Sequence, residues 1–237
     1  IYFPSPTVGY VVGGPEWTAT SGQAFIYKTT DGGETWTELT NHPVTAERGF
    51  LSDVHCKDVD TCWAVGRWAT ILRTVNGGDS WLKSPRPSDR DGNPYGGFLY
   101  SVHWTGTGNV VLSGATLNFI LRSTDGITFN PVPVSNNFVV RDIECPTPNV
   151  CYATAKGRLY YSFNNGVTWG RKIWPSQFNV SRYAYDISFV DNNTGWIIAT
   201  LKDAPPDQPP STILKISNAM TASPVFEQQA AVPVTLE

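Results

Sequence analysis

The 237-residue sequence has no long apolar run and no excess of positive charge. No stretch approaches the ~18 consecutive apolar residues of a membrane-spanning helix. Charged residues make up only 16% of the chain, and 17 lysines and arginines against 20 aspartates and glutamates give a net charge of −3. This balance argues against a nucleic-acid partner, and the lack of an apolar run argues against a membrane span.

Helical periodicity is also absent, and a turn motif recurs in its place. Full copies are Thr29-Thr-Asp31-Gly-Gly33-Glu-Thr35-Trp36, residues 74–81 and residues 162–169. Residues 123–129 form a copy one residue shorter, and residues 216–226 form a degenerate one. Asp or Asn can accept backbone N–H bonds in a tight turn, Gly supplies positive φ, and the aromatic residue packs between sheets. These structural positions are Asp31, Gly33, Trp36, Asn76, Gly78, Trp81, Asp125, Phe129, Asn164, Gly166 and Trp169.

A short apolar strand precedes each turn motif, as in Gly9-Tyr-Val-Val-Gly13 and Cys62-Trp-Ala-Val-Gly66, and successive copies lie 42 to 53 residues apart. A period of this length with about four short strands per unit is typical of propeller blades. The sequence therefore predicts an all-β fold, a β-propeller with five four-stranded antiparallel blades in one domain, 1–237. The expected repeats are approximately 1–49, 50–97, 98–138, 139–182 and 183–237.

The motif S/T-x-D/N-x-G-x-T/S-W resembles the Asp-box (BNR) repeat. Combined stretches such as "GYVVG…YKTTDGGETW" and "CWAVG…ILRTVNGGDSW" are similar to the photosystem II stability and assembly factor type of Asp-box propeller. The resemblance covers nearly the whole chain. It implies a protein-binding assembly factor in a thylakoid lumen or periplasm-like space, with a membrane-protein assembly intermediate as its partner. Asp-boxes also occur in sialidases and other secreted proteins, so the motif predicts the fold more firmly than the function.

Polar residues at equivalent positions of the innermost strands are the candidates for catalysis. Asp53, Asp142 and Asp186 recur from repeat to repeat, which favours a structural role over a pair of glycosidase carboxylates. His55, His103 and Glu144 also share one position, and could converge near the axis either as a metal or acid-base cluster or as hydrogen-bonding links between blades. The sequence has no Arg-Ile-Pro tripeptide of the sialidase type, no Ser-His-Asp set and no phosphate loop. We expect no catalytic residue, no metal and no cofactor.

Four cysteines form two pairs with the same spacing, Cys56 with Cys62 and Cys145 with Cys151. This spacing does not fit a zinc site and favours two local disulfides, each across a turn, although four buried free thiols are the alternative. Disulfides predict an oxidising, extracytoplasmic compartment: thylakoid lumen, periplasm or outside the cell. The sequons at Asn179 and Asn192 agree with this compartment.

The repeat register places the turn motifs and cysteine pairs on one face of the propeller and longer, irregular loops on the other. These loops are roughly 14–24, 40–49, 66–69, 86–97, 115–118, 131–138, 156–158, 170–182 and 200–212. We call their side the loop face and the opposite side the turn face. Exposed aromatic and basic side chains are usual anchors of a recognition surface. The predicted binding residues are Trp17, Arg67, Trp68, Arg86, Arg90, Tyr95, Arg171, Lys172 and Trp174.

The chain opens on "IYFPSP", which matches the second half of an innermost strand, and Val234-Thr-Leu-Glu237 matches the first half. We expect the C-terminal segment to complete the first blade and close a five-bladed ring, the alternative being a stretch of a longer array. Any export signal has been removed or was never included. Three functions fit: a non-catalytic protein-binding assembly factor, a secreted glycan-binding or glycan-hydrolysing protein, and a structural subunit of an extracellular or membrane-associated assembly.

Overall fold

The protein is built almost entirely of β-strands in this computed structural model. The structure describes residues 1–15, 22–44, 49–89, 91–108, 111–115, 119–134, 139–155, 158–173, 180–201, 211–217, 219 and 225–229. The strands form five antiparallel sheets: β1 (Gly9–Gly13), β2 (Phe25–Thr29), β3 (Thr37–Glu38); β4 (Leu51–Cys56), β5 (Cys62–Gly66), β6 (Ile71–Thr74), β7 (Leu82–Lys83); β8 (Leu99–Trp104), β9 (Val111–Ala115), β10 (Phe119–Ser123), β11 (Asn130–Pro133); β12 (Val140–Thr147), β13 (Val150–Ala155), β14 (Arg158–Ser162), β15 (Gly170–Ile173); β16 (Val180–Phe189), β17 (Gly195–Leu201), β18 (Ser211–Ser217), β19 (Val225–Gln229).

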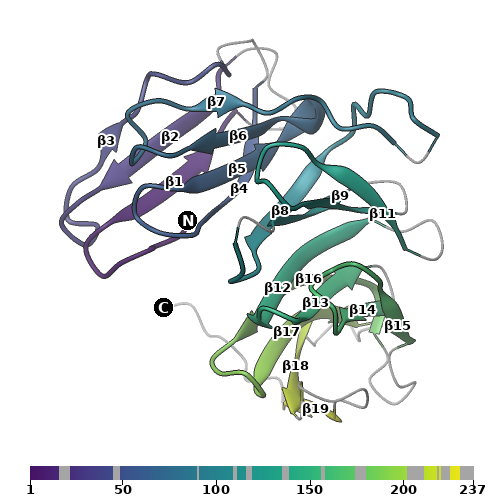
Figure 1. Cartoon of the computed structure of the whole chain (residues 1–237). Helices are drawn as coiled ribbons and strands as arrows, with labels where there is room; N and C mark the ends of the chain where they lie inside the picture. Colours follow the sequence, from purple (N-terminus) through teal and green to yellow (C-terminus); the bar gives the residue numbers. More distant parts are fainter. Residues whose placement is uncertain are drawn as a thin grey trace.

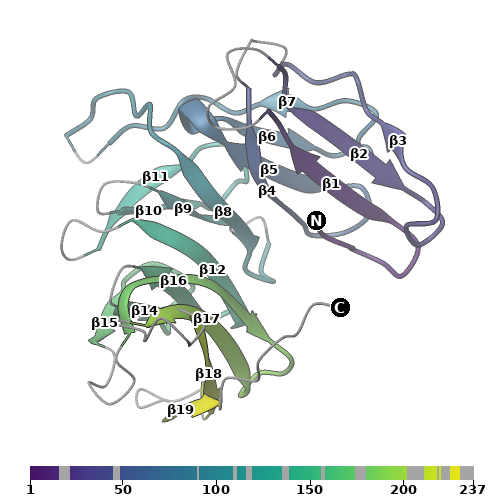
Figure 2. The same cartoon turned by 180° about the vertical axis from the view of Figure 1, so that it is seen from behind.

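Each sheet orders its strands as the chain does, so every sheet is a simple meander. Figure 1 shows the sheets following one another around an arc, from the purple first sheet to the yellow-green fifth, and Figure 2 shows the same arc from behind. The first strands of the sheets, among them β4, β8, β12 and β16, face the middle of the arc. The predicted all-β propeller with five blades is confirmed.

The core lies between blades because the middle strands are buried on both faces. All five residues of β5 are buried. Its side chains alternate, as a pleated strand requires: Trp63 and Val65 pack with the third blade, whereas Cys62 and Ala64 pack with the first. Comparable apolar layers join the third blade to the fourth and the fourth to the fifth. Burial on both faces explains why these strands read as nearly continuous apolar runs.

The first blade contains β1 to β3 and the segment 1–3. Tyr2 and Tyr10 exchange backbone hydrogen bonds of 3.0 and 2.9 Å, which places Tyr2 at the inner edge of the blade, as the sequence predicts. Residues 234–237, expected to complete this inner strand, lie outside the described residues, so closure of the ring stays a prediction. Among the described residues, the four apolar layers join only blades that are neighbours in the chain.

One 3-10 turn, η1 (Arg67–Ala69), is the helical element of the described segments, and none of these segments contains a helix of membrane-spanning length.

Candidate functional site

Polar side chains of the inner strands connect consecutive blades at two levels. At the first level, the backbone N–H of Val102 donates to Asp53 Oδ2 at 2.8 Å, and that of Ile187 donates to Asp142 Oδ2 at 2.9 Å. Ser101 occupies the same position in the third blade, where its hydroxyl donates to Asp142 Oδ1 at 2.8 Å and accepts an N–H of the fourth blade. Each of these bonds joins a side chain of one blade to the next blade.

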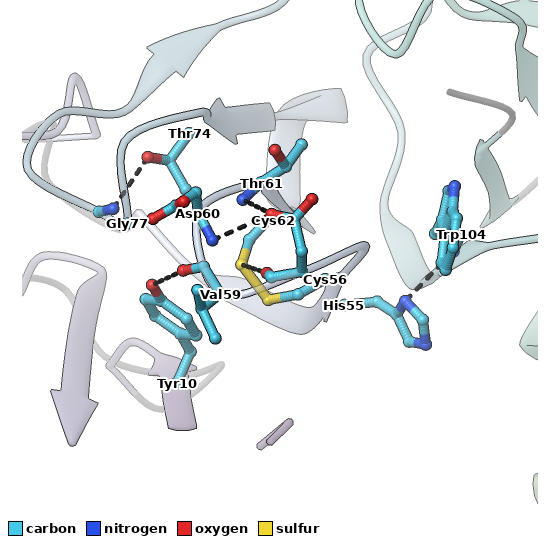
Figure 3. Close-up of a disulfide and its surroundings, with 12 residues drawn as sticks. Tyr10, His55, Cys56, Val59, Asp60, Thr61, Cys62, Thr74, Gly77 and Trp104 are labelled. Carbon is cyan, nitrogen blue, oxygen red and sulfur yellow. Dashed lines mark hydrogen bonds between the residues drawn. A yellow bond between two sulfur atoms is a disulfide. The ribbon is translucent and has the colours of Figure 1, made fainter. Parts of the chain in front are cut away.

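The second level lies two residues further along each inner strand. His55 Nδ1 and His103 Nε2 each accept a backbone N–H of the next blade at 3.3 Å, and Glu144 Oε2 accepts one at 3.0 Å. Figure 3 shows the bond from Trp104 to His55 beside the first disulfide. The ring of Tyr2, at the equivalent place in the first blade, lies 4.1 Å from that of His55, and the His55 and His103 rings are 4.2 Å apart.

These two levels line a cavity of about 310 Å³ near the centre of the arc. Burial raises the pKa of Asp53 to about 6, although two backbone N–H groups oppose the shift, and raises the pKa of Glu144 to about 7. Burial, and a hydrogen bond in which the protonated Asp142 carboxyl donates to Asp186, raise the pKa of Asp142. Burial lowers the pKa of His103 to about 4, and burial together with His103 lowers that of His55. Both imidazoles are therefore neutral at pH 7.

The hydrogen bonds assign the axial groups a connecting role. A ring nitrogen that accepts a backbone N–H offers its lone pair to that bond, so the other nitrogen of a neutral imidazole carries the proton. Such a ring has no lone pair left for a metal ion. In the described part of the chain, no group of three or more His, Cys, Asp or Glu side chains is arranged to hold a metal.

The first repeated turn is held by its own side chains. Asp31 accepts the hydroxyl of Thr29 at 2.6 Å and the backbone N–H and hydroxyl of Thr35 at 2.9 and 2.5 Å. Thr29 Oγ1 in turn accepts the N–H of Gly33 at 2.9 Å, and the indole N–H of Trp36 donates to the Gly33 carbonyl at 3.1 Å. The Asp31 carboxylate is exposed, and these hydrogen bonds hold its pKa well below the usual range.

The other turns repeat this pattern with different residues. Asn76 and Asn164 take the place of Asp31, and each accepts the backbone N–H four residues later, at 3.1 and 2.9 Å. In the shorter turn, Asp125 accepts the N–H of Thr128 at 2.7 Å. Gly33, Gly78, Gly126 and Gly166 have φ between 72° and 98°, the left-handed region that favours glycine.

Both kinds of short connection lie together, as the sequence predicts. The N–H of Gly77, in the second turn motif, donates to the carbonyl of Asp60 at 3.0 Å, and Asp60 lies in the turn closed by the Cys56–Cys62 disulfide. Tyr10 of the first blade also reaches this turn, donating to the Val59 carbonyl at 2.9 Å (Figure 3). The second predicted disulfide, Cys145–Cys151, is present as well, which confirms both pairings.

The loop face carries one unusual aromatic residue, Trp68. Its side chain is 57% exposed, and its backbone is left-handed, with φ 61° and ψ 31°. Ala69 follows with φ 51°, so two consecutive residues other than glycine have positive φ. The turn is fixed on both sides, because Arg67 N donates to the Phe50 carbonyl at 2.9 Å and Ala69 N donates to the Gly97 carbonyl at 2.7 Å.

Two residues predicted to be exposed beside Trp68 are buried. The Tyr95 ring packs against Phe119, with centroids 5.0 Å apart, and its hydroxyl donates to the Phe98 carbonyl at 3.2 Å. Tyr95 therefore anchors the loop after β7, and Arg67 is likewise buried. Arg86, in the same loop, is exposed as predicted, with its guanidinium beside Gly96.

Arg171 and Lys172 were expected in a loop, and that prediction is wrong. Both belong to β15, the outermost strand of the fourth blade, where they face Tyr160 and Leu159 in the register with β14. Arg171 is exposed and Lys172 is half-buried. The remaining predicted binding residues, Trp17, Arg90 and Trp174, lie outside the described residues.

Sequence reasoning missed the basic residues immediately before the turn motifs. Lys28 Nζ and Arg122 Nε each donate to a carbonyl of the next blade's turn, at 2.7 and 2.9 Å. Arg73 occupies the same position in the second blade. A basic residue ahead of three successive motifs is the signal that could have identified this set.

No protein-family model matches the sequence, and no curated protein matches it. Solved structures do. YCF48 from Cyanidioschyzon merolae matches with a TM-score of 0.55 and 16% identity, over 76% of this chain and 64% of that one. The WD40 β-propeller domain of Doa1 matches with a TM-score of 0.58 and 13% identity, over 94% of this chain and 65% of that one. A putative 6-phosphogluconolactonase from Bacteroides uniformis matches with a TM-score of 0.62 and 12% identity, over 94% of this chain and 68% of that one.

The chain thus spans 64% of the length of the YCF48 chain that it resembles. At these identities the likeness shows the fold alone, and that fold is a β-propeller.

Proposed function

We propose that this chain is a non-catalytic protein-binding β-propeller that holds its partner on the loop face, around Trp68 and Arg86. The observation that carries the proposal is the exposed indole of Trp68 on a left-handed backbone. Left-handed backbone costs a residue other than glycine about 1–2 kcal/mol, and such strain concentrates where a protein binds its ligands.

The surroundings of Trp68 suit recognition of a protein. The hydrogen bond between Ala69 and Gly97 joins its turn to the loop that carries Arg86. Tryptophan and arginine are the residues most enriched among those that dominate binding energy at interfaces. Because the turn is already fixed, little conformational entropy is lost when a partner packs on the indole.

The finer assignment rests on the sequence motifs. The repeated turns support an Asp-box (BNR) propeller of the photosystem II assembly-factor type, and we extend the proposal to a membrane-protein assembly intermediate as partner. The two disulfides support an extracytoplasmic compartment. The axial carboxylates and imidazoles support a role without catalysis, since they accept backbone N–H groups of neighbouring blades.

Site-specific photo-crosslinking tests the proposal. A photoreactive phenylalanine analogue replaces Trp68 in one variant and Val190, exposed in a turn between inner strands, in the matched control. In an extract of the native source, position 68 should give a discrete protein adduct that Arg86→Glu abolishes, and position 190 should not. Equal labelling at both positions, or no adduct at position 68, would refute the proposed surface.

A further inference from the structure

Basic residues that precede the turn motifs reach across to the next blade. Lys28 Nζ of the first blade donates to the carbonyl of Gly77, in the turn of the second. Arg122 Nε of the third blade donates to the carbonyl of Asn165, in the turn of the fourth. Gly77 and Asn165 hold the same place in their eight-residue turns, the fourth position of residues 74–81 and 162–169.

Arg73 repeats this arrangement in the second blade, but its acceptor is missing. The turn that it faces, residues 123–129, is one residue shorter, and the carbonyl of the fourth position, Gly126 O, accepts the indole N–H of Trp63 at 2.7 Å. Arg73 Nε is buried with no hydrogen-bond partner, and its guanidinium lies 5.8 Å from the centroid of the Trp63 ring. A buried donor without an acceptor is costly, and Arg73 Nε lacks the carbonyl partner that Lys28 and Arg122 have.

A groove of about 160 Å³ opens at this point between the second and third blades. Arg73 and Lys83 supply its charge, and Val75, Leu82 and Ile127 supply exposed apolar surface, with Leu82 70% exposed. Leu82 and Lys83 form β7, the outermost strand of the second blade. Apolar side chains beside a guanidinium whose Nε has no hydrogen-bond partner, and beside a lysine, match a ligand with an aliphatic group and a carboxylate.

We propose that this groove binds an extended acidic peptide segment of a protein partner. An aliphatic side chain of the peptide packs on Leu82 and Ile127, and a neighbouring carboxylate pairs with the Arg73 guanidinium in the wall of the groove, with Lys83 adding attraction. Charge-assisted bonds from guanidinium to carboxylate are among the strongest hydrogen bonds of proteins. The groove involves a turn motif and not the loop of Trp68, so this proposal is independent of the one above.

Nuclear magnetic resonance measures the binding directly. The probe is the capped peptide acetyl-Ser-Leu-Glu-Leu-Ser-amide, and its control replaces Glu with Gln. The Arg73 Nε–H and Ile127 methyl resonances should shift saturably with the Glu peptide, and the Gln peptide should bind about tenfold more weakly, the effect of one charge-assisted bond. Equal binding of the two peptides, or no saturable shift, overturns the proposal. Concentration-dependent shifts without peptide would identify a second copy of the chain as the occupant and would also overturn it.

Three variants locate the effect. Arg73→Gln should weaken the Glu peptide about tenfold, whereas the matched Arg122→Gln should leave its affinity unchanged, because Arg122 already donates to a carbonyl. A glycine inserted between Asp125 and Gly126 restores the eight-residue turn, and should remove peptide binding and raise the melting temperature. If the insertion does not fold, the Arg73 and Arg122 pair still decides, and equal affinities in that pair refute the site.

Discussion

Acidic side chains in the repeated turns and on the axis accept the same kind of hydrogen bond, yet their pKa values shift in opposite directions. Asp125, exposed in its turn, accepts the N–H groups of Thr128 and Ile127, which lower its pKa to about 2. Asp53 also accepts two N–H groups, yet burial raises its pKa to about 6. Water reaches the turn carboxylate and supports its charge, whereas the axial carboxylate has lost that hydration. Burial, more than the hydrogen bonds, therefore decides whether the charged or the neutral carboxyl is favoured in each region.

The largest effect should come from removing an axial connection between blades. Asp142 accepts the Ser101 hydroxyl and the N–H groups of Ile143 and Ile187. Asp142→Ala leaves the Ile187 N–H and the Ser101 hydroxyl without this acceptor, and we expect a loss of about 3 kcal/mol or more in the free energy of unfolding, measured in urea. Asp142→Asn keeps one acceptor oxygen and should lose less. Equal losses in the two variants would show that the hydrogen bonds are not the cause.

The second prediction concerns pH. The pKa of Glu144 is raised by burial to about 7 in the folded chain. Its contribution to stability is therefore fully present below its unfolded pKa and is lost as pH rises through 7. Glu144→Gln does not titrate, so its stability relative to the parent chain should rise by roughly 2 kcal/mol between pH 4.5 and 8. Thermal or urea unfolding across this range checks it, and parallel pH profiles of the two proteins would contradict it.

Removing the disulfides of the turn face should lower the free energy of unfolding by a similar or slightly smaller amount, and this loss should not depend on pH. The Cys56–Cys62 bond closes a short loop, which in the chain-entropy model stabilises the fold by about 2 kcal/mol. The double variant Cys56→Ser/Cys62→Ser should unfold at correspondingly lower urea. Adding a reductant to the parent chain should have at least this effect, since it also opens Cys145–Cys151. An unchanged unfolding curve under reducing conditions would contradict this prediction.

The smallest effect is expected at an exposed turn carboxylate. Asn stands in the place of Asp31 in the second and fourth blades and accepts the corresponding N–H. Asp31→Asn should therefore leave the melting temperature at pH 7 within experimental error, while Asp31→Ala, which removes the acceptor, should lower it. A large loss in the Asn variant would mean that charge, and not hydrogen bonding, holds this turn.

Local patterns predicted the fold because the structure repeats them locally. The turn motif, the apolar strand before it and the six-residue cysteine spacing each describe contacts within one blade, and the five sheets and two disulfides agree with them. The errors concern contacts between distant segments. Tyr95 resembles an exposed loop aromatic, but Phe119 buries it from another strand. Arg171 and Lys172 resemble loop residues because an outermost strand has a solvent-exposed face that tolerates charge.

The candidate site was predicted only in part for the same reason. The sequence indicates that Trp68 lies in a connection between strands, but the left-handed backbone depends on carbonyls of Phe50 and Gly97, in other segments. Whether Arg73 Nε finds a hydrogen-bond partner depends on the length of a turn about 50 residues later in the chain.

The disulfides stabilise single blades, whereas the axial hydrogen bonds connect one blade to the next. Both covalent bonds link the first two strands of a single blade, Cys56 of β4 to Cys62 of β5 and Cys145 of β12 to Cys151 of β13. The contacts described between blades include apolar packing and hydrogen bonds from side chain to backbone and from side chain to side chain. A pulling force applied across the arc would therefore separate neighbouring blades, which are held by non-covalent contacts, before it opened the disulfide-bonded hairpins of the second and fourth blades.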